Sequence, residues 1–382
     1  MTFWRRKTMK LKYIKSGLVG SALLLAASPA LAEFVAATYN PPDSPTGIFM
    51  QDFADSVKAA TDGEIVFNVF AGGSLLPADG SLSGISANVA QIGQVTANYV
   101  PSDLPLTFML SDVSFTADDQ LALGMAYVQT KLLHPKLVAE ADRNNTVYAT
   151  GYVIGIYNYI CRGNVAKLED LKGKKIRTAT GGQVSFSSSI GAVPVQVPST
   201  EIYTGLQRGS LDCTAGSPEF MTTFFKLTEV ANSVYKLPLG GNANDGYYMN
   251  KDFWKGLTEE QRDEIISILP AATARNAINL LNDVEGAWAA TAEAGIPVNE
   301  PEPEALARLS EYKANFAAKL AATTMERRGV EDPSDVIAYF IEAQDKWKGL
   351  LAGIDPKDEV ALTALIKSEI FDKLDPATYG MN

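Results

Sequence analysis

Histidine and cysteine are scarce in this sequence of 382 residues, which contains one histidine, His134, and two cysteines, Cys161 and Cys213. One histidine and two cysteines on predicted strands cannot supply a His/Cys metal site, a Cys–His pair or a Ser–His–Asp triad. The chain also lacks the GxGxxG, Walker A and GxSxG motifs of dinucleotide binding, phosphate binding and serine hydrolysis. We therefore expect no metal and no cofactor, and His134, which precedes Pro135, is interpreted as a helix-end residue.

Long hydrophobic runs are missing as well. The apolar segment 17–27 is shorter than the roughly 20 residues that a membrane-spanning helix needs. It follows a basic stretch and precedes the small-residue cleavage signal ALA at 30–32, so residues 1–32 have the pattern of a secretory signal peptide. We expect the mature protein to begin at Glu33 in the periplasm, with Met9 as an alternative start. No cysteine lies near the cleavage site to carry a lipid anchor.

Basic residues are few in the predicted mature chain. Removing the leader's six basic residues leaves 27 basic against 44 acidic residues, so the formal net charge falls from −11 to −17. This balance argues against binding to nucleic acid or to anionic membrane surfaces. Carboxylate-only catalysis, as in glycoside hydrolysis, stays open as an alternative, although a solvated acidic surface is the simpler interpretation. A basic pocket for an anion would be a local exception on this acidic chain.

The chain is long enough for two domains, and 46% hydrophobic with 20% charged residues is typical of globular proteins. Residues 161–218 contain a β-α-β-α-β pattern, which predicts a parallel sheet with helices on its faces. Its elements are a strand at 174–179, a helix at 183–190, a strand at 194–197, a helix at 200–208 capped by Ser199, and a strand at 211–214. A second unit is predicted from strands at 34–39, 64–70 and 90–98 and helices at 44–61 and 77–88.

Two later segments connect the predicted units. The apolar segment 146–162 exceeds one typical strand, so we expect it to cross from the first domain into the second. The chain returns near 247–249, and Thr258 and Gln261 form a capping box that opens a helix to about residue 294, long enough to lie against both domains. The predicted division is a leader at 1–32, a first domain of 33–158 and 246–285, and a second domain of 159–245 and 286–382 that ends in helices.

Arg177 lies near the carboxyl end of its predicted strand, where open α/β sheets bind ligands. Its planar guanidinium offers a fork of donors that matches a carboxylate, and the alternative is a solvated strand-end residue. Strand-end placement also makes four first-domain residues candidates to close over a ligand: Tyr39, Asn40, Thr96 and Asn98.

Cys161 and Cys213 each lie on a predicted strand of the same sheet region, in a chain expected in an oxidising compartment. A disulfide is the favoured interpretation. Two free, buried thiols are the alternative, because the Cα separation that decides between them is not visible in a sequence.

The segment DLKGKKIR at 170–177, followed by GAVPVQVPSTEIYTGLQRGSLDC at 191–213, resembles the signature region of the substrate-binding proteins of TRAP transporters, the DctP family. The similarity extends from about residue 34 to 265. It implies an α/β, two-domain periplasmic-binding-protein-like (Venus flytrap) fold with hinge strands and a long domain-spanning helix. It also implies a solute receptor, not an enzyme, that binds a small organic acid between the domains and delivers it to small and large membrane subunits without a cofactor.

The resemblance also implies binding residues. The arginine that matches Arg177 in this family pairs with the ligand carboxylate, and Arg162 matches a second arginine often found in the same cleft. Ser217 falls where an asparagine commonly contacts the ligand, but the segment DCTAGSP departs from the family pattern DGQENP, since it is one residue longer and lacks the glutamate. Glu219 and Phe220, which follow Ser217 and Pro218, are further candidates to face the pocket. Ser199 falls where other family members often direct a side chain towards the ligand.

Two other functions remain as alternatives. One is a periplasmic enzyme that uses carboxylates on an acidic small molecule, and the other is a receptor for an ABC-type importer. The sequence does not name the acid: sugar acids, dicarboxylates, hydroxy or keto acids, amino-acid derivatives and sulfonates all fit. We expect a monomer.

Overall fold

The computed structural model describes residues 1–2, 4, 32–243 and 245–382. Leu31–Asn382 form one compact unit, separate from Met1–Ala30. The predicted leader lies almost entirely outside the described residues, as does the alternative start at Met9, so both stay predictions. Within the described part of the chain, no helix combines the length and the apolar character needed to cross a membrane.

Five strands form the first sheet: β1 (Ala32–Ala37), β2 (Ile65–Phe70), β3 (Ile92–Thr96), β4 (Thr146–Tyr152) and β10 (Asp245–Asn250). Their order is β2-β1-β3-β10-β4. β1 is parallel to β2 and β3, which confirms the first predicted β-α-β-α-β unit. β10 is antiparallel to both β3 and β4, so it begins at the edge of the sheet where the parallel strands end.

Six strands form the second sheet: β5 (Asn158–Cys161), β6 (Lys175–Arg177), β7 (Val193–Val195), β8 (Cys213–Gly216), β9 (Ser233–Tyr235) and β11 (Val298–Asn299). Their order is β11-β9-β5-β8-β6-β7. β6 is parallel to β7 and β8, which confirms the second predicted unit. β5 is antiparallel to β8 and β9, so the sheet as a whole is mixed and not purely parallel.

Helices connect the strands of each unit and cover the sheets. In the first half of the chain they are α1 (Pro45–Ala60), α2 (Ser81–Ser86), α3 (Pro105–Ser114), α4 (Gln120–Leu133) and α5 (Pro135–Arg143), and in the second sheet's unit they are α6 (Gly181–Ser189) and α7 (Ile202–Arg208). α1 shows the local rules: the Ser44 side chain caps its N-terminus by accepting from Gly47 N, and Phe49, Phe53 and Val57 bury one face. His134 lies between α4 and α5, which confirms it as a helix-end residue.

The chain passes between the two sheets after β4, because β4 belongs to the first sheet and β5 to the second. Residues 153–157 make this crossing, within the segment predicted for it. The chain returns from β9 to β10. The assignment of the two sheets to two separate domains stays a prediction, since residues 31–382 cluster as one unit.

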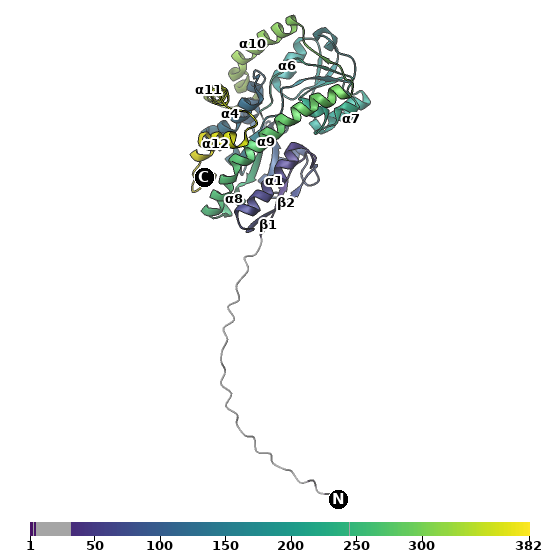
Figure 1. Cartoon of the computed structure of the whole chain (residues 1–382). Helices are drawn as coiled ribbons and strands as arrows, with labels where there is room; N and C mark the ends of the chain where they lie inside the picture. Colours follow the sequence, from purple (N-terminus) through teal and green to yellow (C-terminus); the bar gives the residue numbers. More distant parts are fainter. Residues whose placement is uncertain (3, 5–31, 244) are drawn as a thin grey trace. The chain divides into compact units, whose positions relative to one another are not determined.

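The helix α9 (Glu259–Glu293) is 35 residues long and begins with the predicted capping box of Thr258 and Gln261. Near its middle, the Thr273 hydroxyl lies 2.7 Å from the Thr150 hydroxyl of β4. Further along, Trp288 lies under the Lys236 ammonium, which follows β9 of the second sheet. α9 therefore lies against both sheets, and Figure 1 shows it running from the end near α1 to the end near α7.

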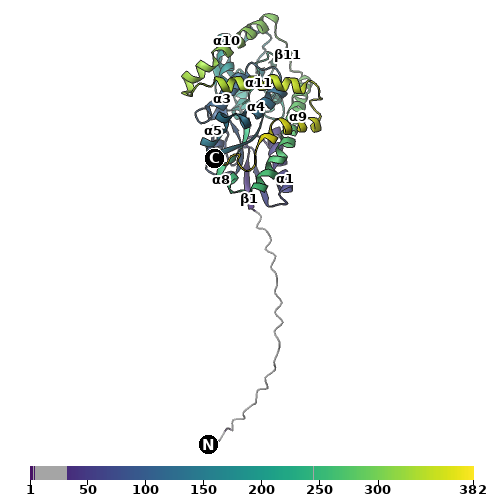
Figure 2. The ribbon, with the colours of Figure 1, turned by 90° about the vertical axis from the view of Figure 1, so that its left-hand side faces the viewer.

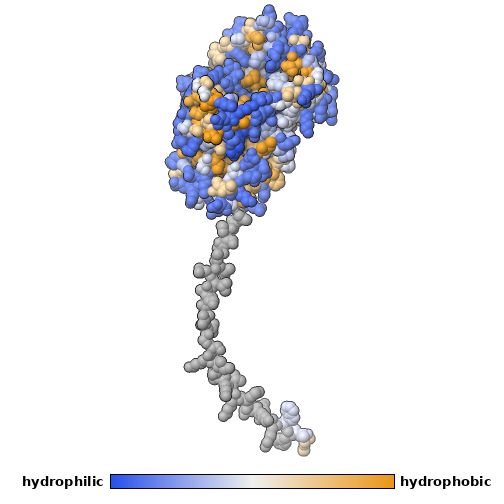
Figure 3. All heavy atoms as spheres, viewed as in Figure 1, coloured by the Kyte–Doolittle hydropathy of each residue, from blue (hydrophilic) through white to orange (hydrophobic). Residues whose placement is uncertain are grey.

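Three further helices follow α9 at the C-terminal side: α10 (Pro303–Arg328), α11 (Ser334–Leu351) and α12 (Glu359–Glu369), and the short α8 (Lys251–Gly256) precedes it. α11 packs on α4 (Figure 2), and α12 packs on α9. On the face seen in Figure 3, hydrophilic residues predominate and apolar residues occur in separate patches.

Candidate ligand-binding site

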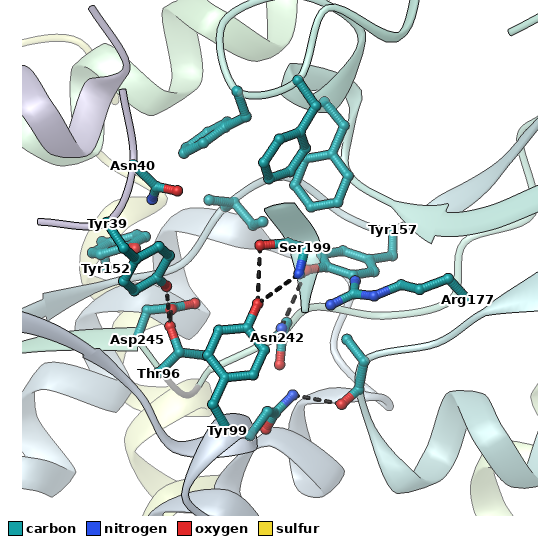
Figure 4. A pocket seen from close by; sticks show the side chains of 16 residues that line it. Tyr39, Asn40, Thr96, Tyr99, Tyr152, Tyr157, Arg177, Ser199, Asn242 and Asp245 are labelled. Atoms are coloured by element: carbon teal, nitrogen blue, oxygen red, sulfur yellow. Dashed lines mark hydrogen bonds between the residues drawn. The ribbon is translucent and has the colours of Figure 1, made fainter. Parts of the chain in front are cut away.

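A pocket lies where the two sheets face each other, and it contains about 420 Å³ of space that protein atoms do not fill. The segments that follow β1, β3 and β6 all reach it, because the carboxyl ends of parallel strands meet at one edge of a sheet. Figure 4 shows the lining side chains, which come from both sheets and from the connections between them. The lining residues are Tyr39, Asn40, Thr96, Asn98, Tyr99, Tyr152, Ile154, Tyr157, Arg177, Ala179, Ser199, Phe220, Phe224, Phe225, Asn242 and Asp245.

Arg177 is the cationic group of this pocket. Its side chain is 4% exposed, and its Nε donates a hydrogen bond to the backbone oxygen of Val197 at 3.2 Å. Its Nη1 is buried without a hydrogen-bond partner among the described residues. A buried guanidinium that lacks a partner is costly unless an anion completes its hydrogen bonds. The site is therefore built to receive a negatively charged group.

Asp245 is the acidic group of the pocket and lies opposite Arg177 in Figure 4. It is the first residue of β10, so its position follows from the antiparallel entry of that strand. Its Oδ1 accepts a hydrogen bond from the Thr96 hydroxyl, which also contacts the Tyr39 hydroxyl. Burial raises the pKa of the Asp245 carboxyl to about 7, while the Thr96 hydroxyl and the Arg177 charge act in the opposite direction.

Hydrogen bonds join the two sides of the site. Asn98, after β3, donates from Nδ2 to the backbone oxygen of Ala179, after β6, at 2.5 Å. The Tyr99 hydroxyl is bonded to both the N–H and the Oγ of Ser199. Outside the pocket, Asp112 of α3 accepts from the first N–H of α6, that of Gly181, at 2.7 Å. These contacts hold the first-sheet residues against the second-sheet residues.

Aromatic side chains form the apolar wall. Phe220 packs edge-on against Phe225, with ring centroids 4.8 Å apart, and edge-on against Tyr157 at 5.8 Å. Asn242 adds a polar group, because its Nδ2 donates to the Tyr157 hydroxyl at 3.1 Å and its Oδ1 has no partner among the described residues. The wall therefore combines apolar contact area with a few fixed hydrogen-bonding groups, as small-molecule sites usually do.

The structure brings seven of the ten sequence-based candidates to this pocket: Arg177, Ser199, Tyr39, Asn40, Thr96, Asn98 and Phe220. The separate prediction that Ser199 caps the following helix is wrong. The turn that opens its helix has Pro198 at the N-cap and no side-chain capping bond. The Ser199 hydroxyl is instead bonded to Tyr99 across the pocket.

The other three candidates do not line the pocket. Arg162 follows β5, which runs antiparallel to β8, so it lies exposed at the opposite edge of the second sheet from Arg177. Ser217 is fully buried beside the turn η5 (Pro218–Met221). Glu219 points away from the pocket, and its Oε1 accepts a hydrogen bond from Gly155 N at 2.9 Å. The short helical turn directs Phe220, but not its neighbour Glu219, into the site.

Nine lining residues were not found from the sequence. Tyr99 directly follows Asn98, so the strand-end argument that identified Asn98 could also have identified Tyr99. No sequence pattern could have identified Asp245 and Asn242, because their position depends on β10 entering the first sheet between β3 and β4. The remaining six belong to aromatic or apolar segments that sequence patterns assign to a core: Tyr152, Ile154, Tyr157, Ala179, Phe224 and Phe225.

Cys161 of β5 and Cys213 of β8 are direct cross-strand neighbours, and they form the disulfide favoured from the sequence. The bond closes a loop that contains β6 with Arg177 and the turn with Ser199. No group of three His, Cys, Asp or Glu side chains is arranged to hold a metal ion in the part of the chain that the structure describes.

Residues 36–324 match the family model described as bacterial extracellular solute-binding protein, family 7, named DctP. A C4-dicarboxylate-binding periplasmic protein DctP from Rhodobacter capsulatus is 26% identical over 279 residues, which cover 69% of this chain and 80% of that protein. A solute-binding protein from Albidiferax ferrireducens is 23% identical over 224 residues, and the match spans 64% of its length, just under two thirds.

Solved structures share the fold. DctP7 of Bordetella pertussis, an extracytoplasmic solute receptor described as binding pyroglutamic acid, superposes with a TM-score of 0.70 at 21% identity. That match covers 82% of this chain and 99% of DctP7. The sugar acid binding protein DctPAm from Advenella mimigardefordensis, solved with galactonate, gives a TM-score of 0.71 at 20% identity and covers 83% of this chain and 98% of its own. The periplasmic-binding-protein-like fold with a long helix is thereby confirmed.

Proposed function

Because this chain belongs to family 7 of the bacterial extracellular solute-binding proteins, the DctP family, we propose that it is a periplasmic receptor of a TRAP-type transporter. The ligand is a small organic acid bound in the pocket between the two sheets. The observation that carries this proposal is the buried Arg177, whose Nη1 has no hydrogen-bond partner among the described residues. A ligand carboxylate provides both the missing acceptor and the countercharge.

The ligands of structural neighbours support an acid as the substrate class. DctP7 is described as binding pyroglutamic acid and DctPAm was solved with galactonate, and both ligands carry a carboxylate. The wall of Phe220, Phe224 and Phe225 excludes water from the acid group, which strengthens its attraction to Arg177.

Binding stabilises a closed arrangement in this proposal. Residues 33–158 and 246–285 form one domain, and residues 159–245 and 286–382 form the other. The contacts Asn98–Ala179 and Tyr99–Ser199 link them when the pocket is shut. A ligand that touches both sides shifts the population to the closed state, and the small and large membrane subunits of the transporter recognise that state.

The protein acts as a receptor and not as an enzyme in this proposal. Carboxylate-only catalysis requires two carboxyl groups beside the substrate, one as acid and one as base or nucleophile. Asp245 is the one acidic side chain among the described residues that line the pocket. A single carboxylate that accepts from Thr96 is better suited to ligand recognition than to that chemistry.

A thermal-shift screen of the mature protein against organic acids tests the proposal, followed by calorimetry on each acid that raises the melting temperature. We expect at least one acid to bind at one molecule per chain and to be recovered unchanged. Failure of every carboxylate in the panel to bind, or conversion of a bound acid to product, would overturn it.

A further inference from the structure

The pocket has two charged poles, and the anion site proposed above uses only one of them. Arg177 and Asp245 are both buried, with 4% and 6% of their surfaces exposed, and both line the cavity. Figure 4 shows them on opposite sides of it. A carboxylate in an anion-binding pocket repels the ligand charge. Its presence therefore requires a ligand group that interacts favourably with it.

The hydrogen bonds around Asp245 define what that group must be. The Thr96 hydroxyl donates to Asp245 Oδ1. A hydroxyl has one proton, so the contact between Thr96 and the Tyr39 hydroxyl is one in which Tyr39 donates and Thr96 accepts. The protons of both hydroxyls are thus committed within the protein. The Tyr152 hydroxyl, which accepts from Gln94 Nε2 at 2.5 Å, keeps its proton for the neighbouring Asp245 carboxyl, so Asp245 is the main acceptor that this side of the pocket offers to a ligand.

The second carboxylate oxygen of Asp245, Oδ2, can still accept hydrogen bonds. Among the described residues, the Thr96 hydroxyl donates to Oδ1, the Tyr39 and Tyr152 hydroxyls also lie beside the carboxyl, and Oδ2 is not among the fully buried unpaired atoms. An ionised carboxylate accepts up to about four hydrogen bonds, so a ligand donor can be accommodated. Asn242 adds a second acceptor near the site, since its Oδ1 lacks a partner among these residues.

We infer that Asp245 accepts a hydrogen bond from a hydroxyl or amide N–H of the ligand, at the end opposite the carboxylate that Arg177 binds. The substrate class is then a monocarboxylic acid with such a donor, and not a dicarboxylate. A second carboxylate would place two acceptors and two like charges together, and both effects oppose binding. This inference deepens the proposed function and rests on it.

Matched pairs of acids test the inference by calorimetry on the full mature chain. Pyroglutamate is compared with 3-oxocyclopentanecarboxylate, in which a CH2 group replaces the ring N–H and the carbonyl is kept. 3-Hydroxybenzoate is compared with benzoate, which lacks the hydroxyl, and succinate represents dicarboxylates. We expect the donor-bearing acid of at least one pair to bind about tenfold or more tightly than its partner, and succinate to bind more weakly than that acid.

The variant Asp245→Asn keeps the size of the side chain and removes its charge. We expect it to lower affinity for the favoured acid and to reduce the ratio within its pair to below about threefold, because the amide is a weaker acceptor. The wild-type ratios decide the question even if this variant does not fold. Equal affinities within every pair that binds, or tightest binding of succinate, would overturn the inference and leave the receptor function standing. Absence of binding by all five acids and by the wider screen would overturn both.

Discussion

Tyr99 and Ser199 are joined by two hydrogen bonds across the pocket. The Ser199 N–H donates to the Tyr99 hydroxyl at 3.0 Å, and that hydroxyl donates to Ser199 Oγ at 2.9 Å. Tyr99 follows a strand of the first sheet, and Ser199 follows a strand of the second. In the proposed receptor, the pair exists only while the two sides are together, so it contributes to the closed arrangement.

The substitution Tyr99→Phe removes both bonds and keeps the ring. We expect it to weaken ligand binding by about 1–2 kcal/mol, roughly 5- to 30-fold in Kd, because closure loses two hydrogen bonds. Calorimetry measures the change. Tyr203→Phe is the matched control, since the Tyr203 hydroxyl bonds Glu229 at an exposed site outside the pocket. Equal losses in both variants would contradict a role in closure.

The substitution Arg177→Met tests two effects of the buried guanidinium: its attraction to the ligand and its cost to the stability of the ligand-free protein. We expect ligand affinity to fall by about 2–5 kcal/mol. The melting temperature of the ligand-free protein should stay the same or rise, because the cost of burying the guanidinium disappears. Calorimetry and thermal denaturation measure the two effects.

The control for that experiment is Arg162→Ala. Arg162 is exposed and lies away from the pocket, so its removal should leave Kd within about twofold. A large loss of affinity in this variant, with little loss in Arg177→Met, would contradict the assignment of Arg177 as the carboxylate-binding residue.

Glu219 gives the stability of the protein a pH dependence. Burial raises the pKa of its carboxyl to about 7, against roughly 4.3 for an unfolded chain. The folded state therefore holds more protons between these values, and the free energy of unfolding falls as the pH rises from about 4.5 to 7. In Glu219→Gln this decrease should become smaller, and stability above pH 7 should increase. Denaturant unfolding at several pH values measures both.

The amide of that variant keeps an oxygen that can accept from Gly155 N, so the contact at the crossing survives. Close packing there depends on a glycine: a Cβ at Gly155 would lie 2.8 Å from Val284 of α9 and 2.9 Å from Glu219 Oε2. Glu201→Gln, at an exposed glutamate, is the control. An identical pH profile in wild type and Glu219→Gln would show that the buried carboxyl does not titrate in this range.

Lys131 produces the opposite slope at higher pH. Its ammonium is buried, donates to the Thr107 hydroxyl at 2.5 Å and lies 3.9 Å from Glu140. Burial lowers its pKa to about 8, so between pH 8 and about 10.4 the unfolded chain binds more protons and stability rises with pH. Lys131→Met should lack this rise, and it should be less stable than wild type at pH 7 because Glu140 is left buried without its countercharge, with the deficit growing toward pH 9.5. A constant difference across this range would contradict the lowered pKa.

The sequence predicts those parts of the fold that follow local rules. Helix periodicity at 44–61 and the capping box at Thr258 and Gln261 both identify elements that the structure contains. The two β-α-β-α-β units follow from the alternation of these elements. The end of the strand that carries Arg177 is set by local sequence, so its strand-end position could also be predicted.

Non-local pairing limits what the sequence can predict about the site. The family resemblance implied that Arg162 lies in the same cleft as Arg177, but the antiparallel direction of β5 puts it at the opposite edge of the sheet. Asp245 enters the pocket because β10 inserts between β3 and β4, and no local pattern contains that insertion. Ser199 shows the converse, since a local capping preference was replaced by a tertiary contact with Tyr99.

The disulfide between Cys161 and Cys213 has a consequence for proteolysis of the chain. The bond spans 52 positions of sequence, and the intervening residues carry Arg177 and Ser199. A protease that nicks the backbone once anywhere inside this ring leaves both fragments covalently tied. A singly cleaved molecule therefore migrates as one chain until a reductant is added, and β6, which carries Arg177, stays covalently linked to β5 and β8.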